Sequence, residues 1–561
     1  MIYLPLSVFS PVMKIPVITD LLQRRGRRRL RRVMRGYRYL KESNQLGRIT
    51  AVKEALTNTK INQCERRASK LIFGARHGNA ELIIRQYLLI RVGGLNLNKA
   101  LLYALGKPGS DVVHPLPPEW RTVIEQHGFK VARIRSALAW YGYVVLLLVY
   151  GTASIALQLV GSVKEIIRPT FRGTGKFAYF NALTAGNLPQ PCKDGRSHDI
   201  VSWYQQWLWR VSELDTLCHG VKGVAPGVVG GVPVVSIPSA IPPLTQIDAL
   251  ARFIGWSVAA SALALIDLVR GRWWHALMLG EASFAATISA HEPNRLARDY
   301  LFHNSGWIYR PLWTYEAEKH GSRITFYFYS TNCEPFNRPD GYPKLTYGWQ
   351  AMNWPHYLVW DEYQADFVRR AVGERANISV VGPIWFHTSA VEMHALPTRT
   401  VAVFDVQPVR DAFYNTLGID FDYYTPKTAN QFLSDIYKVL EDVDCILALK
   451  RKRKIGKLSH PAYRKYIEKL EELPNFVAVD PDISAWRLIE DSIAVVSMPF
   501  TSTALLGREL NKPSIYYDPG RVLQKDDRAA HGIEILCGPD ELRGWLSTVL
   551  EKEIVSEGNH V

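Results

Sequence analysis

The chain has 561 residues, of which 47% are hydrophobic and 21% are charged, and its formal net charge is +16. This length exceeds what one hydrophobic core holds and the composition excludes a disordered protein, so about two or three globular domains are expected. The basic balance suggests an anionic partner, namely nucleic acid, a nucleotide-sugar or anionic lipid. The six cysteines form no C-x-x-C pair, which indicates neither a disulfide framework nor a zinc site and fits a reducing, cytoplasmic compartment.

The N-terminal region carries a dense arginine block between residues 24 and 38. Such a block attracts the phosphates of nucleic acid or of lipid headgroups, although a solvated basic tail has the same composition. Because the mildly apolar residues 1–22 precede the arginines instead of following them, no signal peptide is predicted. We expect a basic helical region over residues 1–135, whose membrane-contacting residues are Arg24, Arg25, Arg27, Arg28 and Arg29.

A long apolar segment favours lipid as the partner of that block. Residues 136–163 carry no charge, and basic residues flank the run at both ends. The run is long enough to cross a hydrocarbon layer of about 30 Å, but it also fits a helix in the plane of the membrane or a helix in a protein core. We therefore expect a hydrophobic membrane-associated segment over residues 136–168. A second apolar run, residues 253–266, is too short to cross and predicts a core or interfacial helix.

From about residue 294 the pattern changes to strands that alternate with helices or loops. Apolar, β-branched and aromatic runs predict parallel strands at 324–331, 356–360 and 378–386. Glu316 lies on a helix before the first of these strands, and Asp361 directly follows the second. We expect residues 169–395 to form an N-terminal Rossmann-like domain with helical insertions and a loop-rich connector at 222–243.

Residues 396–550 alternate more regularly, and residues 551–561 form a tail. Strands are predicted at 400–408, 444–454, 476–481, 493–496 and 514–517, and helices at 429–440, 462–473, 483–490 and 503–510. This spacing predicts a parallel, doubly wound sheet.

One βαβ unit of this domain, residues 491–519, places hydroxyls at the mouth of the sheet. An apolar strand is followed by the polar turn 497–502 and then by a helix. Thr501, Ser502 and Thr503 lie where the helix N-terminus offers N–H groups and a partial positive charge, which suits a phosphate or diphosphate. The alternative is that one of these hydroxyls merely caps the helix.

The same unit carries a family resemblance. Pro499-Phe500-Thr501-Ser502, followed by the sequence NKPSIYYDPG, resembles the signature of the bacterial polysaccharide biosynthesis PFTS-motif proteins, over about residues 294–545. These proteins resemble GT-B glycosyltransferases. The resemblance implies two Rossmann-like domains that face each other across a cleft holding an activated sugar.

The resemblance also implies a nucleotide site. Bacterial sialyltransferases of GT-B fold hold cytidine monophosphate with a His-Pro motif and a downstream Ser/Thr motif, which match His460 with Pro461 and Ser502 with Thr503 here. A histidine there can protonate a leaving phosphate, although a solvent-facing loop histidine before a helix is the alternative. Lys450 is the first residue of a basic run and is a candidate for neutralising the nucleotide phosphates. The alternative is that the whole run is a solvated charged surface.

The chain departs from enzymes of this fold that use UDP-sugars. Those enzymes carry a ribose-binding glutamate where this chain has Leu505 or Leu506, and Glu509 lies about one helical turn too late. This favours a CMP- or CDP-linked donor. Asp420 and Asp422 have D-x-D spacing but lie in an expected solvated turn, so we expect a metal-independent reaction with no cofactor besides the nucleotide-sugar co-substrate.

Transfer also needs a group that deprotonates the acceptor hydroxyl. Asp361 is the first candidate because it follows a strand end, and Glu316 is the second. Glu318 and Glu362 are two further candidates. The alternative for each of the four carboxylates is a surface or structural role.

The sequence thus predicts a glycosyltransferase of surface polysaccharide biosynthesis that transfers a sugar to a membrane- or lipid-linked glycan. It is expected at the cytoplasmic face of the inner membrane, peripheral or single-pass, bound to anionic lipid and not to nucleic acid. A CDP-polyol phosphotransferase and a non-catalytic scaffold of the polysaccharide machinery are the alternatives.

Overall fold

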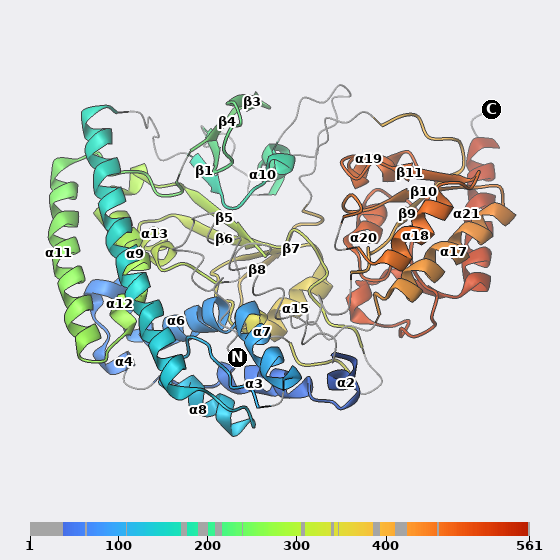
Figure 1. The fold of residues 1–561 in the computed structure, drawn as a ribbon. Coiled ribbons are helices and arrows are strands. Elements are labelled where there is room, and N and C mark those ends of the chain that lie inside the picture. Colours follow the sequence, from blue (N-terminus) through green and yellow to red (C-terminus); the bar gives the residue numbers. More distant parts are fainter. Residues whose placement is uncertain are drawn as a thin grey trace.

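The computed structural model describes residues 37–558 except for 62–63, 108, 170–176, 189–199, 208–215, 238, 305–308, 338–340, 346, 385–392, 410–422 and 457–458. The described chain forms two α/β lobes, each built around a largely parallel sheet (Figure 1). This confirms the predicted fold class of two Rossmann-like domains. The membrane-contacting arginines predicted at Arg24, Arg25, Arg27, Arg28 and Arg29 lie outside the described residues, as do Asp420 and Asp422.

The N-terminal lobe has an eight-stranded sheet of order β3-β4-β2-β1-β5-β6-β7-β8. All neighbouring strands are parallel except the β3–β4 edge pair. The strand order reverses between β1 and β5, which makes this the topological switch point of the lobe. The strands are β1 Phe177–Phe180, β2 Thr216–His219, β3 Gly227–Val229, β4 Val232–Ser236, β5 Asp299–His303, β6 Arg323–Tyr327, β7 Tyr357–Val359 and β8 Ile378–Val380.

Two segments of this lobe differ from the sequence-based expectation. The stretch predicted as a loop-rich connector holds the β3–β4 hairpin, because Gly230 and Gly231 adopt φ angles of +53° and +81° and close a two-residue turn. The apolar run predicted at 253–266 belongs to a longer helix, Ile247–Val269, because the flanking polar residues continue its helical turns. That helix is long and apolar enough to cross a membrane, so the prediction that it is too short was wrong.

The described part of residues 1–135 packs into the same core as the N-terminal sheet, with buried residues such as Val52, Leu88 and Trp120. The helices of the lobe are α2 Tyr37–Glu42, α3 Gly47–Thr57, α4 Cys64–Arg67, α5 Lys70–Phe73, η3 Gly74–Asn79, α6 Ala80–Tyr87, η4 Leu88–Val92, α7 Leu95–Gly106, α8 Pro118–Gln126, α9 Arg133–Ile167, η5 Ala185–Asn187, α10 Ile200–Trp207, α11 Ile247–Val269, α12 Trp274–Ala290, η7 Pro293–Arg295, α13 Trp313–Lys319, α14 Tyr347–Gln350 and α15 Glu362–Val372.

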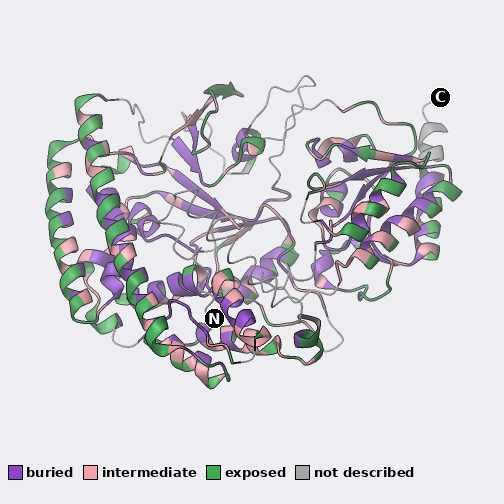
Figure 2. Ribbon diagram, in the orientation of Figure 1, coloured by how far each residue is buried: buried purple, intermediate pink, exposed green. Residues whose placement is uncertain are grey.

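Helices α9 and α11 lie side by side at the far side of this lobe from the C-terminal lobe (Figure 1). Both pack on α12, which is buried along most of its length. The backbone N–H of Leu244, just before α11, donates to Ser162 Oγ near the end of α9 at 3.0 Å, so the two helices run antiparallel. Their outward faces are exposed (Figure 2). Many of the exposed side chains there are large and hydrophobic, such as Leu157 of α9 and Val258 of α11.

The C-terminal lobe has a six-stranded, fully parallel sheet of order β11-β10-β9-β12-β13-β14. In chain order this is 3-2-1-4-5-6, the arrangement of a dinucleotide-binding Rossmann fold, with its switch point between β9 and β12. The strands are β9 Thr400–Phe404, β10 Ile446–Lys450, β11 Phe476–Val479, β12 Ala494–Ser497, β13 Ser514–Asp518 and β14 Glu534–Cys537.

Side chains alternate between the two faces of this sheet, as the period of two requires. Val401 and Val403 of β9 join a core with α17, α18 and α21, whereas Ala402 and Phe404 join a core with α19 and α20. Helices on both faces confirm the predicted doubly wound arrangement. The helices are α17 Pro426–Asp442, α18 Pro461–Leu470, α19 Ala485–Glu490, α20 Ser502–Glu509, η8 Arg528–Ala530 and α21 Pro539–Gly558.

Candidate functional site

The switch point between β9 and β12 defines the candidate site, because ligands of open α/β sheets bind outside the carboxyl ends of the strands where the strand order reverses. Asp405 and Gln407 follow β9, and the turn 498–501 follows β12 and leads into α20. His460 comes to the same edge, because its backbone N–H donates to Pro408 O at 2.9 Å. Tertiary structure thus gathers residues from three separate segments.

The turn after β12 is held in an unusual conformation. Phe500 has a φ angle of +64°, a conformation that bulky residues rarely adopt. Residues in such strained conformations are found most often at functional sites. Its ring packs edge-on against Phe336 of the N-terminal lobe, with ring centroids 4.5 Å apart. Tyr424 and Tyr516 donate to the carbonyls of Pro499 and Thr501, each at 2.7 Å. The surroundings therefore fix the orientation of this turn.

The three hydroxyls of this turn have separate partners. Thr501 is the N-cap residue of α20, yet its side chain donates to Met498 O at 2.8 Å and does not cap the helix. Thr503 Oγ1 lies 2.9 Å from Ser497 Oγ. Ser502 Oγ accepts from the backbone N–H of Thr331, after β6 of the N-terminal lobe, at 3.1 Å. The first turn of α20 thus lacks a capping side chain at Thr501, and its N–H groups face the switch point.

Asp405 is the residue that sequence reasoning missed. It is 7% exposed, its Oδ2 accepts from the Tyr463 hydroxyl, and its Oδ1 is buried without a partner. Burial raises the pKa of this carboxyl to about 6, against the lowering effects of Tyr463 and Arg451. The available signal was its position directly after the first strand of a doubly wound domain.

Two more buried polar atoms without a partner lie beside Asp405. They are Gln407 Nε2, two residues further along the chain, and Arg451 Nε, directly after β10. The charge of Arg451 acts on Asp405, so the two side chains are close. These three atoms are free to pair with the polar groups of a ligand that enters at this edge of the sheet.

His460 lies at the start of α18 with Pro461 at the first helical position. Its Nδ1 accepts from the backbone N–H of Ala462 at 3.2 Å, so the ring caps its own helix. With Nδ1 as acceptor, the neutral ring carries its proton on Nε2 and can donate it to a phosphate oxygen. Lys450, in contrast, is buried, donates to Pro481 O at 3.2 Å, and has its ammonium pKa lowered to about 8 by that burial.

The structure separates the two predicted acceptor bases. Asp361 is the N-cap residue of α15 and lies between the lobes, where His531 Nδ1 is 2.8 and 2.9 Å from its two oxygens and Arg508 is 3.4 Å away. Burial raises the pKa of this carboxyl, but His531 and Arg508 outweigh burial and hold the pKa below its usual value. Asp361 therefore joins the lobes, and its oxygens are already engaged.

Glu316 lies elsewhere, in a groove lined only by residues of the N-terminal lobe. Its Oε1 accepts from the backbone N–H of Ala75 at 2.7 Å and its Oε2 from Ser289 Oγ at 3.1 Å. The expectation that Glu316 reaches the cleft with Asp361 and His460 is not met, because α13 carries it toward the amino end of β6 instead of its carboxyl end.

A histidine that the sequence analysis did not single out lies at the switch point of the N-terminal lobe. His303 ends β5 at the switch point beside β1, and its Nε2 lies 3.2 Å from Ala182 O. Burial lowers the pKa of its imidazole, which keeps the ring neutral at neutral pH. Tyr327 and Tyr329 pack around it, with ring centroids 5.5 Å from its own.

Within the described part of the chain, no three His, Cys, Asp or Glu side chains come together in a way that could hold a metal ion.

Residues 256–546 match the sequence profile of a family described as "Polysaccharide biosynthesis PFTS motif protein". None of the curated proteins compared with this sequence is significantly similar to it.

Several solved structures align with part of this chain at low TM-scores. The glycosyltransferase SnogD from Streptomyces nogalater is 14% identical and aligns over 67% of this chain and 94% of its own, with a TM-score of 0.32. The lipopolysaccharide outer core galactosyltransferase WaaB is 11% identical over 67% of this chain and 90% of its own, also at 0.32. The UDP-GlcNAc 2-epimerase from Methanocaldococcus jannaschii is 8% identical over 49% and 74%, at 0.28. TM-scores this low support no conclusion by themselves.

Proposed function

Because this chain belongs to the polysaccharide biosynthesis PFTS motif family, we propose that it is a glycosyltransferase that moves a sugar from a nucleotide donor, with CMP-linked donors favoured, to a membrane- or lipid-linked glycan. The observation that carries this proposal is the set of buried polar atoms without partners beyond the carboxyl ends of the adjacent strands β9 and β10, Asp405 Oδ1, Gln407 Nε2 and Arg451 Nε. A nucleoside monophosphate offers donors for a carboxylate and acceptors for an amide and a guanidinium.

The phosphate of the donor then lies at the first turn of α20. The N–H groups and partial positive charge of that turn stabilise the negative charge that develops on the departing nucleotide. His460 Nε2 donates to a phosphate oxygen, and Ser502 and Thr503 contribute hydroxyls. Because Ser502 accepts from Thr331 in this structure, full engagement of Ser502 by phosphate requires that contact to rearrange.

The acceptor hydroxyl needs a base on the opposite lobe, and the position of His303 at the N-terminal switch point supports that role. In the transfer, the acceptor oxygen forms a bond to the anomeric carbon and its proton passes to the His303 imidazole. The bond from the anomeric carbon to the nucleotide phosphate breaks, and its electron pair leaves with the phosphate. No metal ion takes part in this proposal.

The proposed enzyme is peripheral to the cytoplasmic face of the membrane, bound through α9, α11 and the N-terminal arginines. Both helices are long and apolar enough to cross a bilayer, but one face of α9 packs against α12. Gly151 packs directly on Gly280 and Leu279, and Gln158 Nε2 donates to Ser283 Oγ at 2.8 Å. Crossing would require α9 to leave α12, so the packing favours helices that lie in the plane of one leaflet.

A thermal-shift titration of detergent-purified protein with CMP, CDP and UDP tests the nucleotide site. A ligand at about 100 times its Kd adds about 2.7 kcal/mol to the free energy of unfolding. CMP should stabilise the wild type but not His460→Ala or Ser502→Ala/Thr503→Ala, whereas Lys469→Ala, on the exposed end of α18, should respond like the wild type. Absence of stabilisation by any of the three nucleotides would overturn the proposal and favour a non-catalytic scaffold.

A further inference from the structure

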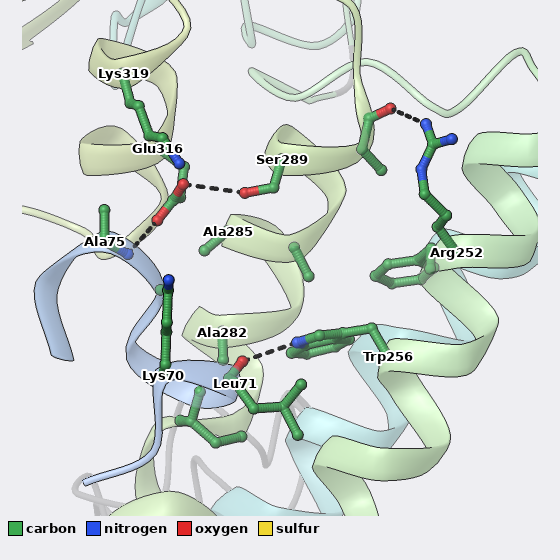
Figure 3. A pocket seen from close by; sticks show the side chains of 15 residues that line it. Lys70, Leu71, Ala75, Arg252, Trp256, Ala282, Ala285, Ser289, Glu316 and Lys319 are labelled. Atoms are coloured by element: carbon green, nitrogen blue, oxygen red, sulfur yellow. Dashed lines mark hydrogen bonds between the residues drawn. The ribbon is translucent and has the colours of Figure 1, made fainter.

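A groove in the N-terminal lobe, separate from the nucleotide site, has the features of a lipid site. It has a volume of about 540 Å³ and lies between α5, α11, α12 and α13 (Figure 3). This volume is in the range of sites that hold small organic ligands.

The floor of the groove is apolar and made of small side chains. Four alanines of α12, Ala282, Ala285, Ala286 and Ala290, leave the space open. Phe253 and Trp256 of α11 stack on each other at 5.7 Å along one wall, and Trp256 Nε1 donates to Leu71 O at 2.8 Å. This donation satisfies the indole N–H, so the wall offers only ring surface to a ligand.

Three exposed cations surround this apolar floor. Lys70 and Lys319 lie near one end and Arg252 near the other (Figure 3). Arg252 also pairs with the exposed Asp248 at 2.5 Å. Glu316 closes the end between the two lysines, but both of its oxygens already accept hydrogen bonds from Ala75 and Ser289. The groove therefore combines apolar walls with a positive rim.

The groove borders the surface that the proposed function assigns to the membrane. Arg252, Phe253 and Trp256 wall the groove, while Ile254 and Val258 on the same turns of α11 are 45% and 68% exposed and face outward. A helix lying in a leaflet would therefore place the groove where hydrocarbon chains and phosphate headgroups meet.

We propose that this groove binds one hydrocarbon chain of an anionic membrane lipid, with the lipid phosphate at the end that Lys70 and Lys319 flank. The proposal rests on the membrane attachment inferred above and is independent of the nucleotide site. Because the rim is positive, it should bind a lipid headgroup with a net negative charge more tightly than a zwitterionic headgroup, whose own cation offsets the phosphate charge.

The test compares melting temperatures of detergent-purified protein with dioleoyl phosphatidylglycerol, dioleoyl phosphatidylcholine and inorganic phosphate. Phosphatidylglycerol should raise the melting temperature by about 3 °C or more, and the other two should raise it by less. Ala286→Phe, which fills the groove, should lose the effect, whereas Ala259→Phe on the exposed face of α11 should keep it. Retained CMP stabilisation and an unchanged circular dichroism spectrum show that Ala286→Phe is folded.

A charge variant provides the second arm. Lys70→Glu/Lys319→Glu should reduce the preference for phosphatidylglycerol over phosphatidylcholine, while Lys427→Glu/Lys438→Glu, an equal charge change on α17, should not. The proposal would be overturned if both lipids stabilised the protein equally, or if inorganic phosphate stabilised it as much as phosphatidylglycerol does. It would also be overturned if Ala286→Phe responded to phosphatidylglycerol like the wild type. Loss of CMP binding alone would overturn the nucleotide site and leave the groove intact.

Discussion

The carboxylate of Asp361, on the N-terminal lobe, lies 2.8 and 2.9 Å from Nδ1 of His531, on the C-terminal lobe. His531 is 2% exposed, and Arg508 approaches the same carboxylate at 3.4 Å. A second carboxylate, Glu334, bridges Arg370 of its own lobe and Arg528 of the other. The two lobes are thus joined by the Asp361–Arg508 and Glu334–Arg528 ion pairs and by the hydrogen bond between Asp361 and His531.

Asp361→Asn should lower the free energy of unfolding by about 2 kcal/mol at pH 7, because the substitution leaves Arg508 without its counter-charge and disturbs the hydrogen bond with buried His531. The pKa of Asp361 is lowered in the folded protein, so its contribution is present above the unfolded pKa and is lost as pH falls through the folded pKa. The difference from the wild type should therefore shrink below about pH 3.8. Asp366→Asn, whose carboxylate is 64% exposed, should change stability by less than about 0.5 kcal/mol in the same denaturant titrations.

Between pH 4 and pH 8 the wild type should lose about 2 kcal/mol of unfolding free energy through ionisation of Asp405. Asp405→Asn should not show this loss. The folded pKa of Asp405 is about 6 against a usual 3.8, so the carboxyl favours the folded state only while protonated and loses that contribution as pH rises through this window. The same variant should lose CMP binding. Asp526→Asn, at an exposed position, is the control, and parallel stability–pH curves for Asp405→Asn and wild type would contradict the assignment.

His303→Ala should lower the transfer rate by about 100-fold or more while leaving CMP stabilisation unchanged, because the base acts on the acceptor and does not touch the nucleotide. Burial lowers the pKa of His303, so the wild-type rate should stay constant as pH falls to 6.5 and decline only below it. CMP release in the presence of donor and acceptor measures both effects. His356→Ala, whose ring contacts Ser379 away from this edge, should retain the rate; equal losses in the two variants would remove His303 from the mechanism.

Gly507→Ala should destabilise the C-terminal lobe by about 2 kcal/mol. A Cβ at this position of α20 would collide with Ser514 Oγ and come within 2.8 Å of Val495 Cγ2, so α20 could not pack on β12 and β13 as closely as it does. Gly544→Ala is the matched change in α21, where a Cβ meets nothing within 4 Å, and it should stabilise by about 0.5 to 1 kcal/mol. Thermal unfolding of both variants measures the difference, and equal signs would be inconsistent with this packing.

Leu157→Glu/Val160→Glu should abolish flotation of the protein with vesicles of phosphatidylcholine and phosphatidylglycerol. These side chains are 73% and 66% exposed on the outward face of α9, and burying charge in the hydrocarbon layer is costly. Because neither side chain is buried in the protein, folding and CMP binding should be unchanged. Leu473→Glu, at a 37% exposed position of the C-terminal lobe, should float like the wild type. Flotation of both variants would place the membrane contact elsewhere.

The sequence by itself determined the features that depend on local pattern. Regular alternation of apolar runs predicted the doubly wound C-terminal domain, and the long uncharged run predicted α9, because the periodicity and length of apolar segments depend only on neighbouring residues. The motif Pro499-Phe500-Thr501-Ser502 likewise identified the family, because a short contiguous motif needs no tertiary structure to be recognised.

Only the tertiary structure decided which of the candidate side chains meet. Asp361 and Glu316 were both candidate bases from the sequence, yet the fold places Asp361 between the lobes and Glu316 in a groove of the N-terminal lobe. Asp405 became a candidate only because Tyr463, 58 residues away, and the surrounding core bury it and leave one oxygen without a partner. Burial and hydrogen bonding depend on residues distant in sequence, so no local pattern could separate an engaged carboxylate from an available one.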